Sequence, residues 1–144
     1  MRALLDVNVL VALLDGGHLH HRLATDWLAA HARRGWASCP LTQNGCVRIL
    51  SLPSYPNAQP PGSVAQRLAE ACADPSHAFW SDDLSLLDAG RVRWERVLGS
   101  RQVTDVYLLA LAADHGGVFV TFDRAIATEA VTGAAKKHLL VLGA

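Results

Sequence analysis

Two aspartates each close a short apolar run, a position at which acidic side chains often do chemistry. Asp6 follows residues 3–5, and Asp123 follows the glycine-preceded, β-rich run 118–122. In open α/β sheets, ligands bind just beyond the carboxyl ends of the strands. A buried strand does not itself need an acid at its end. The repeated pattern therefore predicts that Asp6 and Asp123 share one site.

A third acid, Asp105, follows Thr104 at the start of a strongly periodic segment, for which we expect a helix over 106–115. Thr104 is a candidate helix cap, and the first turn of a helix favours negative charge. Capping by itself explains Asp105, and it also explains Asp6 as the residue before a helix expected over 7–14. The joint occurrence of three acids favours a site.

Bringing these carboxylates together is costly. At about 4 Å and an effective dielectric constant of about 20, two like charges repel by roughly 4 kcal/mol. Either raised pKa values or a divalent cation must offset this repulsion. Oxygen ligands without a matching histidine or cysteine indicate Mg²⁺ or Mn²⁺ rather than zinc. A cation in such a site activates water and neutralises the charge that builds on a phosphate, as in metal-dependent nucleases.

Short strands without hydrophobic–polar alternation, separated by helices, predict an α/β fold whose mostly parallel sheet of four to five strands has helices on both faces. The expected strands span 3–5, 36–39, 77–80, 118–122 and 139–142. The expected helices span 7–14, 18–33, 43–50, 63–73, 84–89, 106–115 and 124–131. Asp82 and Asp83 follow the third strand, where they either join the acidic edge or cap the helix 84–89.

The composition predicts one compact domain over residues 1–144, with 51% hydrophobic and 18% charged residues. The formal net charge is zero, which excludes a global basic signature of a nucleic-acid binder. No apolar run approaches the roughly 18 to 20 residues of a membrane span. Three cysteines without a close pair fit free thiols in a reducing compartment. We therefore expect a cytoplasmic protein with no membrane partner.

Two further clusters leave alternatives open. His18, His20 and His21 lack metal-ligand spacing on one helix face, so surface or helix-start positions are the preferred interpretation. The arginine-rich stretch 90–102 with Trp94 is either a solvated loop around one buried tryptophan or a platform for RNA. Any RNA specificity is expected to reside in groove shape and in loops such as 53–62 and 90–102.

Three blocks of sequence resemble the signatures of the PIN domain: residues 4–8 (LLDVN), 101–112 (RQVTDVYLLALA) and 120–123 (VTFD). More narrowly, the chain resembles VapC-type ribonuclease toxins of bacterial toxin–antitoxin pairs, over nearly its whole length. The resemblance implies a Mg²⁺-dependent endoribonuclease that forms a homodimer and is inhibited by a VapB-type antitoxin. It implies Asp6, Asp105 and Asp123 as catalytic and metal-binding acids, with Asn8, Thr104 and Thr121 as supporting polar residues.

The sequence departs from the PIN pattern at one position. PIN domains commonly carry a fourth acid, a glutamate, on the helix after the second strand, whereas residues 36–51 contain no carboxylate. Gln43 is the expected occupant, with Asn44 second. A glutamine can bind water or RNA but cannot act as a base or add negative charge. Arg48, nearby, either approaches the phosphate or pairs with an acid.

This departure motivates an alternative function: a PIN-fold module with weakened or lost catalysis that binds antitoxin or RNA. Other folds that place an acid at the end of their first strand fit less well. A haloacid-dehalogenase-type phosphatase needs a second aspartate where Asn8 stands, and a receiver domain needs a lysine after its late strands. The retained acids and threonines favour the active nuclease.

Overall fold

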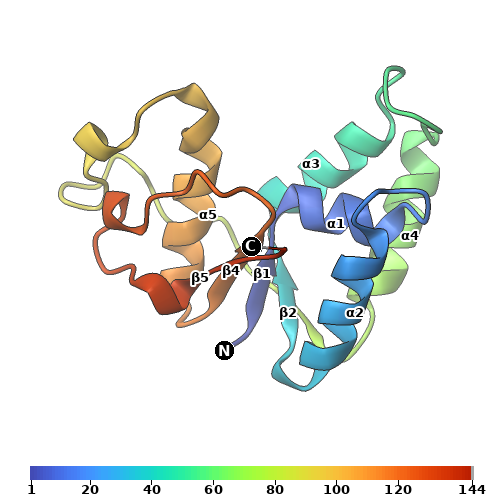
Figure 1. The fold of residues 1–144 in the computed structure, drawn as a ribbon, viewed down its shortest axis with the longest axis horizontal. Helices are drawn as coiled ribbons and strands as arrows, with labels where there is room; N and C mark the ends of the chain where they lie inside the picture. The colour runs from blue at the N-terminus through green and yellow to red at the C-terminus, as the bar shows by residue number, and fades with distance from the viewer. Residues whose placement is uncertain (144) are drawn as a thin grey trace.

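Five parallel strands form the centre of the molecule, which the computed structural model describes over residues 1–143 (Figure 1). Their spatial order is β3-β2-β1-β4-β5, and every neighbouring pair is parallel. The strands are β1 (Ala3–Leu5), β2 (Trp36–Ser38), β3 (His77–Phe79), β4 (Val118–Thr121) and β5 (Leu139–Val141). The predicted α/β fold with a parallel sheet is confirmed.

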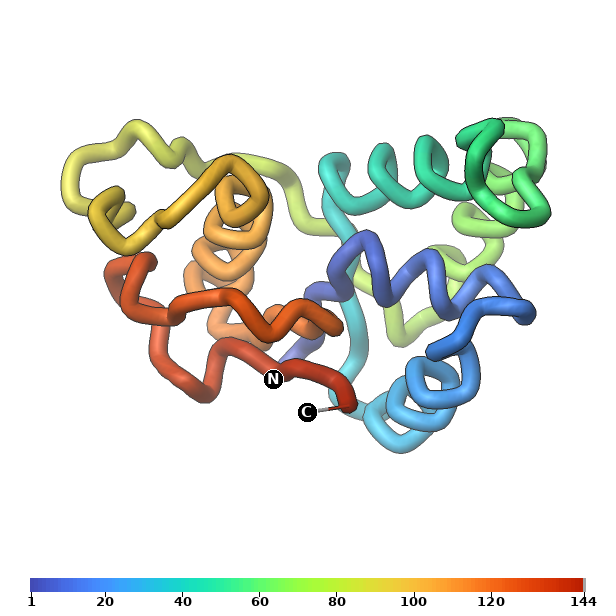
Figure 2. The backbone as a smooth tube through the Cα atoms, turned by 45° about the horizontal axis from the view of Figure 1, so that its top comes forward, coloured from blue at the N-terminus to red at the C-terminus, as the bar shows by residue number. Residues whose placement is uncertain are grey.

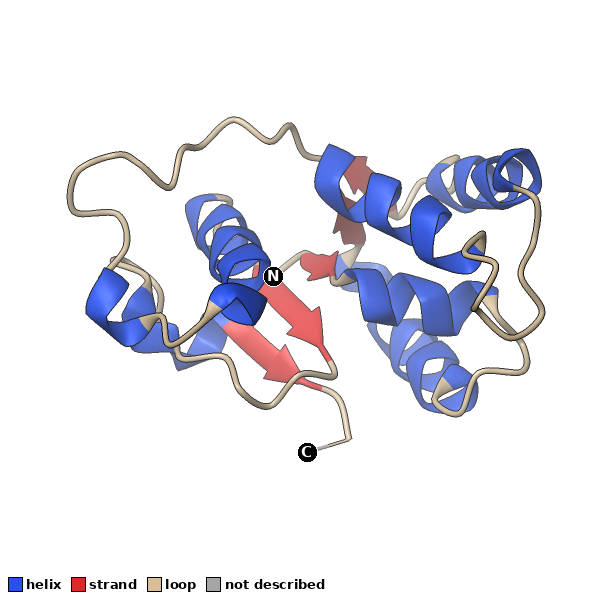
Figure 3. Ribbon diagram, turned by 90° about the horizontal axis from the view of Figure 1, so that it is seen from above, coloured by secondary structure: helices blue, strands red, loops and turns tan. Residues whose placement is uncertain are grey.

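Helices cover both faces of this sheet, as predicted. They are α1 (Val7–Leu14), α2 (His21–His31), α3 (Pro40–Leu50), α4 (Pro61–Cys72) and α5 (Val103–Asp114). Helices α1 to α4 gather on one side and α5 lies on the other (Figures 1 and 2). The connection from β3 to α5 is a long segment without an α-helix, and it crosses between the two sides (Figure 3).

Strand β1 separates two hydrophobic cores because successive side chains of a strand point to opposite faces. Ala3 and Leu5 belong to the core under α1 to α4, whereas Leu4 belongs to the core under α5. All three are at most 3% exposed. A strand buried on both faces needs a continuous apolar run, which is why residues 3–5 lack hydrophobic–polar alternation.

Two predicted helices, over 84–89 and 124–131, are wrong. In the first segment the backbone amide of Leu87 donates to the Ser85 side chain, a local turn that competes with helix formation. The second contains a single 3₁₀ turn, Thr128–Ala130, and Val131 forms an antiparallel bridge with Val92. Local turns and long-range pairing therefore override helix propensity in both segments.

The starts of the four other helices after α1 also differ from the prediction, and α4 begins at Pro61 rather than at residue 63. Helix α2 begins at His21, later than predicted. Helix α3 begins at Pro40, because proline is tolerated in the first turn, where no intrahelical N–H bond is needed. Helix α5 begins at Val103, so Thr104 lies inside its first turn and is not its cap. Among residues 1–143, no helix is both long and apolar enough to span a bilayer.

The close approach of β1 and β4 generates a test of this architecture. A Cβ atom on Gly117 would lie 2.6 Å from the carbonyl oxygen of Arg2, which accepts a hydrogen bond from the Val118 amide. Gly117→Ala should therefore lower the free energy of unfolding by about 1–3 kcal/mol in urea titrations. Gly62→Ala, in open space on α4, should be neutral or stabilising by up to about 1 kcal/mol. Equal stability of the two variants would contradict the packing at this edge.

Candidate active site

The three predicted acids border one cavity at the carboxyl edge of the sheet. Strands β1 and β4 are neighbours with Leu5 opposite Val120, so Asp6 and Thr121 leave the sheet side by side. Asp123 follows two residues later, and Asp105 comes from the first turn of α5. The cavity has a volume of about 400 Å³. Its lining consists of Asp6, Val7, Asn8, Val11, His18, Ile49, Tyr55, Asp105 and Asp123.

Asp6 is both a helix cap and a member of this cavity, so the two interpretations of its position do not exclude each other. Its Oδ1 accepts a hydrogen bond from the backbone amide of Val7 at 2.7 Å, which caps α1. Its Oδ2 accepts from the hydroxyl of Thr121 at 2.6 Å. Both carboxylate oxygens are thereby held in fixed directions.

Thr121 links two of the acids through one oxygen atom. Besides donating to Asp6, its fully buried hydroxyl accepts a hydrogen bond from the backbone amide of Asp123 at 3.0 Å. Asp123 in turn accepts from the amide of Ala125 at 2.8 Å, a local turn that holds the chain after β4. The end of β4 therefore positions Asp6 and Asp123 together.

Burial and mutual repulsion raise the pKa values of two of these acids. Burial first, and then the neighbouring carboxylates of Asp6 and Asp123, raise the pKa of Asp105 to about 7. The pKa of Asp6 is also raised, mainly by burial, although the hydrogen bonds from Thr121 and Val7 oppose the shift. Asp6 and Asp105 are 7% and 9% exposed. Without a cation, the cluster thus reduces its charge by retaining protons.

Asn8 adds an unpartnered oxygen to the same cavity. Its side-chain Oδ1 is buried and has no hydrogen-bond partner among the described residues. A buried carbonyl oxygen without a partner is unfavourable unless a ligand or water binds it. Asn8 therefore lines the cavity with the acids and has a buried side-chain oxygen that could bind a ligand or water.

The oxygen donors fit a hydrated cation rather than a fully protein-ligated one. In residues 1–143, no three His, Cys, Asp or Glu side chains converge into a complete metal-binding cluster. Mg²⁺ usually keeps several waters and needs only one or two carboxylates. Three acids around one cavity, two of them with raised pKa values, meet that requirement.

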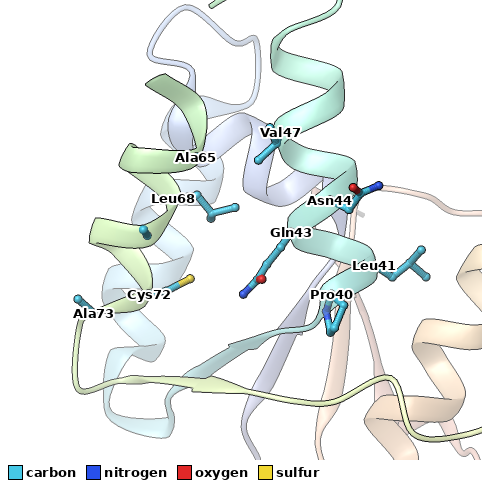
Figure 4. A pocket seen from close by; sticks show the side chains of 10 residues that line it. Pro40, Leu41, Gln43, Asn44, Val47, Ala65, Leu68, Cys72 and Ala73 are labelled. Carbon is cyan, nitrogen blue, oxygen red and sulfur yellow. The ribbon is translucent and has the colours of Figure 1, made fainter. Parts of the chain in front are cut away.

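Gln43 and Asn44 do not line this cavity, so the structure does not bring the predicted substitutes for the fourth acid to the three aspartates. Both line a separate groove between α3 and α4 instead, with Gln43 extending toward α4 (Figure 4). The side-chain amide of Gln43 donates to the hydroxyl of Ser38 at 2.9 Å, on the β2 face that α4 covers. This hydrogen bond holds Gln43 away from the acids.

Other predicted residues also lie outside the cavity. Thr104 is exposed on the first turn of α5, and no hydrogen bond joins it to an acid in the described chain. Arg48 is exposed and forms no ion pair within residues 1–143. Asp82 neither joins the acids nor caps its own segment, because its carboxylate accepts from the amide of Leu41 at 2.9 Å and so caps α3.

Two cavity residues were not singled out from the sequence. His18 was expected on the surface, and Tyr55 lies in the proline-rich loop that was expected to influence specificity. Each stands in a glycine- or proline-rich connection next to a helix that borders the site. The sequence signal for these two residues is a ring side chain in a loop. Only the fold shows that both loops lie beside the acids.

Comparison with known proteins agrees with this geometry. The family described as "PIN domain" matches residues 3–130. Ribonuclease VapC44 of Mycobacterium tuberculosis is 51% identical over 142 residues, covering 99% of this chain and 100% of that protein. Ribonuclease VapC39 of the same organism is 42% identical, covering 92% and 96% of the two chains. Ribonuclease VapC38 is 43% identical, covering 88% of each.

The raised pKa of Asp105 predicts how stability depends on pH. The folded protein binds a proton on Asp105 up to about pH 7, whereas the unfolded chain releases it near 3.8, the ordinary pKa of an aspartate. Metal-free protein should therefore lose stability as the pH rises from about 4 to 7. Asp105→Asn should remove much of this slope and raise the free energy of unfolding at pH 8, by an amount on the order of 2 kcal/mol. Urea titrations in EDTA at pH 5 and pH 8 test both statements, and an unchanged slope in the variant would contradict them.

Proposed function

Since this chain belongs to the PIN domain family, we propose that it is a metal-dependent endoribonuclease of the VapC type, acting as the toxin of a toxin–antitoxin pair. The observation that carries the proposal is that Asp6, Asp105 and Asp123 all line one cavity. The near full-length similarity to several VapC ribonucleases supports the same activity. The substrate is accordingly RNA, cleaved at a phosphodiester bond.

Asp6, Asp105 and Asp123 would hold a divalent cation, Mg²⁺ or alternatively Mn²⁺, together with water. Once bound, the cation supplies positive charge for the phosphate and lowers the pKa of water. Thr121 keeps Asp6 and Asp123 oriented, and the capping bond from Val7 fixes the second oxygen of Asp6. Asp105 gives up its retained proton when a cation replaces it. Asn8 offers its free Oδ1 to a water or to the substrate.

A VapB-type antitoxin and a second copy of the chain are the protein partners in this proposal. An antitoxin would inhibit the activity by covering the acidic cavity. The homodimer follows from the resemblance to VapC toxins. Both can be tested by co-expression with a neighbouring antitoxin gene and by measurement of mass in solution.

The orientation of Gln43 favours one competing function, a PIN-fold module with weakened or lost catalysis. With no fourth acid beside the cavity, the cation site carries less negative charge, and affinity for a divalent ion falls. A chain weakened in this way would bind antitoxin or RNA without cutting it. Cleavage measurements with the purified protein separate the two functions.

Substitution of the acids tests the nuclease. We expect the purified chain to cut RNA in Mg²⁺ or Mn²⁺ but not in EDTA, and Asp6→Asn and Asp105→Ala each to lower the rate by at least about 100-fold. Asp26→Asn removes an acid whose side chain is 74% exposed on α2 and serves as the matched control. Cleavage that survives either active-site change would refute the assignment. A folded, antitoxin-free protein that cuts no RNA in any metal would support the binding module instead, and Gln43→Glu would then be the next variant.

Thr121→Val tests the link between the acids while keeping the side-chain shape. Loss of the hydroxyl leaves only Oδ2 of Asp6 without its donor, so we expect cleavage to fall by about 10- to 100-fold. The free energy of unfolding should fall by about 1–3 kcal/mol. Thr25→Val removes a hydroxyl that bonds only to the backbone oxygen of His21 on α2, and it should leave the cleavage rate unchanged. Equal rates for the two variants would show that Thr121 does not orient the acids.

A further inference from the structure

The acidic cavity has a second, ring-lined side that the proposed chemistry does not use. His18 lies in the turn between α1 and α2, and Tyr55 lies in the segment between α3 and α4. Both are partly exposed. They come from connections 37 positions apart in the sequence (55 minus 18), yet they border the same space as the three aspartates.

One residue, Asp15, bonds to both connections, at the side chain of Tyr55 and at the backbone of His18. Its carboxylate accepts a hydrogen bond from the hydroxyl of Tyr55 and another from the amide of Gly17 at 3.0 Å. Its carbonyl oxygen accepts from the amide of His18 at 3.0 Å. Burial and the contact with Asp15 raise the pKa of Tyr55 to about 12, so the phenol remains a donor to Asp15. The two rings are therefore preorganised before any ligand binds.

The hydrogen bonds also define what each ring can offer a ligand. His18 Nδ1 accepts from the amide of His20 at 3.0 Å, which leaves Nε2 as the nitrogen available to a ligand. Tyr55 uses its hydroxyl on Asp15, so its ring surface remains for contact. Next to them, the His20 ring stacks on Phe122 at 4.8 Å, beside Asp123. A flat, polar-edged ring is the ligand group that such surfaces suit.

Charge cannot supply the affinity for RNA in this cavity. Its described lining contains three aspartates and no lysine or arginine. The phosphate would be bound through the cation, and stacking of a base on an aromatic side chain adds about 1–3 kcal/mol without any positive charge. The ring-lined side of the cavity must therefore supply the remaining affinity that holds an RNA strand in place.

We propose that His18 and Tyr55 bind the nucleobase next to the scissile phosphate and so determine which RNA sequence is cut. This inference rests on the proposed ribonuclease function. His18 Nε2 reads a polar edge of the base or ribose, and Tyr55 packs against the ring. Asp15 is the positioning residue for the Tyr55 side chain and for the turn that carries His18.

The test measures RNA binding separately from cleavage. Binding is measured by fluorescence anisotropy in Mg²⁺ with short single-stranded RNAs, and each set of RNAs has one position fixed as A, C, G or U. All binding variants also carry Asp105→Asn, so that the RNA is not cut during the measurement. Adding His18→Ala or Tyr55→Ala should weaken binding of the preferred RNA by about 5- to 100-fold and reduce the differences among bases. Tyr55→Phe keeps the ring and should retain the base preference. Cleavage by the corresponding variants with Asp105 intact should lose sequence preference and show a raised KM.

Matched controls come from ring residues that do not line the cavity. His31→Ala removes a histidine at the end of α2, and Tyr107→Phe changes the other tyrosine of the chain, on α5. Neither should alter affinity or preference. Thermal unfolding verifies that each variant is folded, and His18→Gln, which can still accept a bond from His20, replaces the alanine variant if that one is not.

The outcomes separate this inference from the function on which it rests. Unchanged base preference in folded His18 and Tyr55 variants of a protein that cuts RNA would overturn the inference alone. Base-selective binding that depends on these rings in a protein that cuts nothing would support recognition of the base by the rings, but it would overturn the nuclease and with it their role in choosing the cleavage site. Absence of RNA binding by the protein with Asp105 intact would overturn the inference as well, and retained affinity for an antitoxin would then assign the rings to a protein partner.

Discussion

The hydrogen bond from Thr121 to Asp6 is the contact on which the rest of the site depends. It joins residues 115 positions apart in the sequence, and it forms only because β1 and β4 pair in parallel with Leu5 opposite Val120. A shift of one residue in that register would turn Thr121 to the other face of the sheet. The apolar side chains of β1, buried on both faces, hold the register and thereby the acids.

The same contact explains how the fold tolerates three neighbouring carboxyl groups. Burial disfavours the charged forms of Asp6 and Asp105, and the hydroxyl of Thr121 and the amide of Val7 stabilise the charge on Asp6. Asp105 receives no comparable support, and its pKa rises to about 7. The acids therefore differ in proton affinity although they share one cavity, and a cation would compete mainly with the proton on Asp105.

The surroundings of the acids divide into regions with different chemistry. The acidic side carries Asn8 with its unpartnered oxygen, while the ring-lined side is held by Asp15. Helix α3 corresponds to the helix that carries a glutamate in other PIN domains. Here it presents Gln43 to the groove between α3 and α4. This arrangement places the three acids after β1, after β4 and on α5, and it leaves α3 to form a wall of the separate groove.

The sequence by itself determined the parallel α/β fold, the positions of the strands and the identity of the three acids. These features depend on local patterns: uninterrupted apolar runs, helical periodicity and acids at strand or helix ends. Predictions from local patterns fail where local propensity competes with other contacts, as in segments 84–89 and 124–131. There, side-chain turns and the pairing of Val92 with Val131 replace the predicted helices.

Only the tertiary structure decided which side chains face the acids. It brought His18 and Tyr55 to the cavity and placed Gln43 and Thr104 outside it. The physical reason is that the direction of a side chain depends on hydrogen bonds to distant partners, such as Ser38 for Gln43 and Asp15 for Tyr55. Sequence spacing encodes which element a residue belongs to, but the partner that orients its side chain is fixed only when those elements pack together.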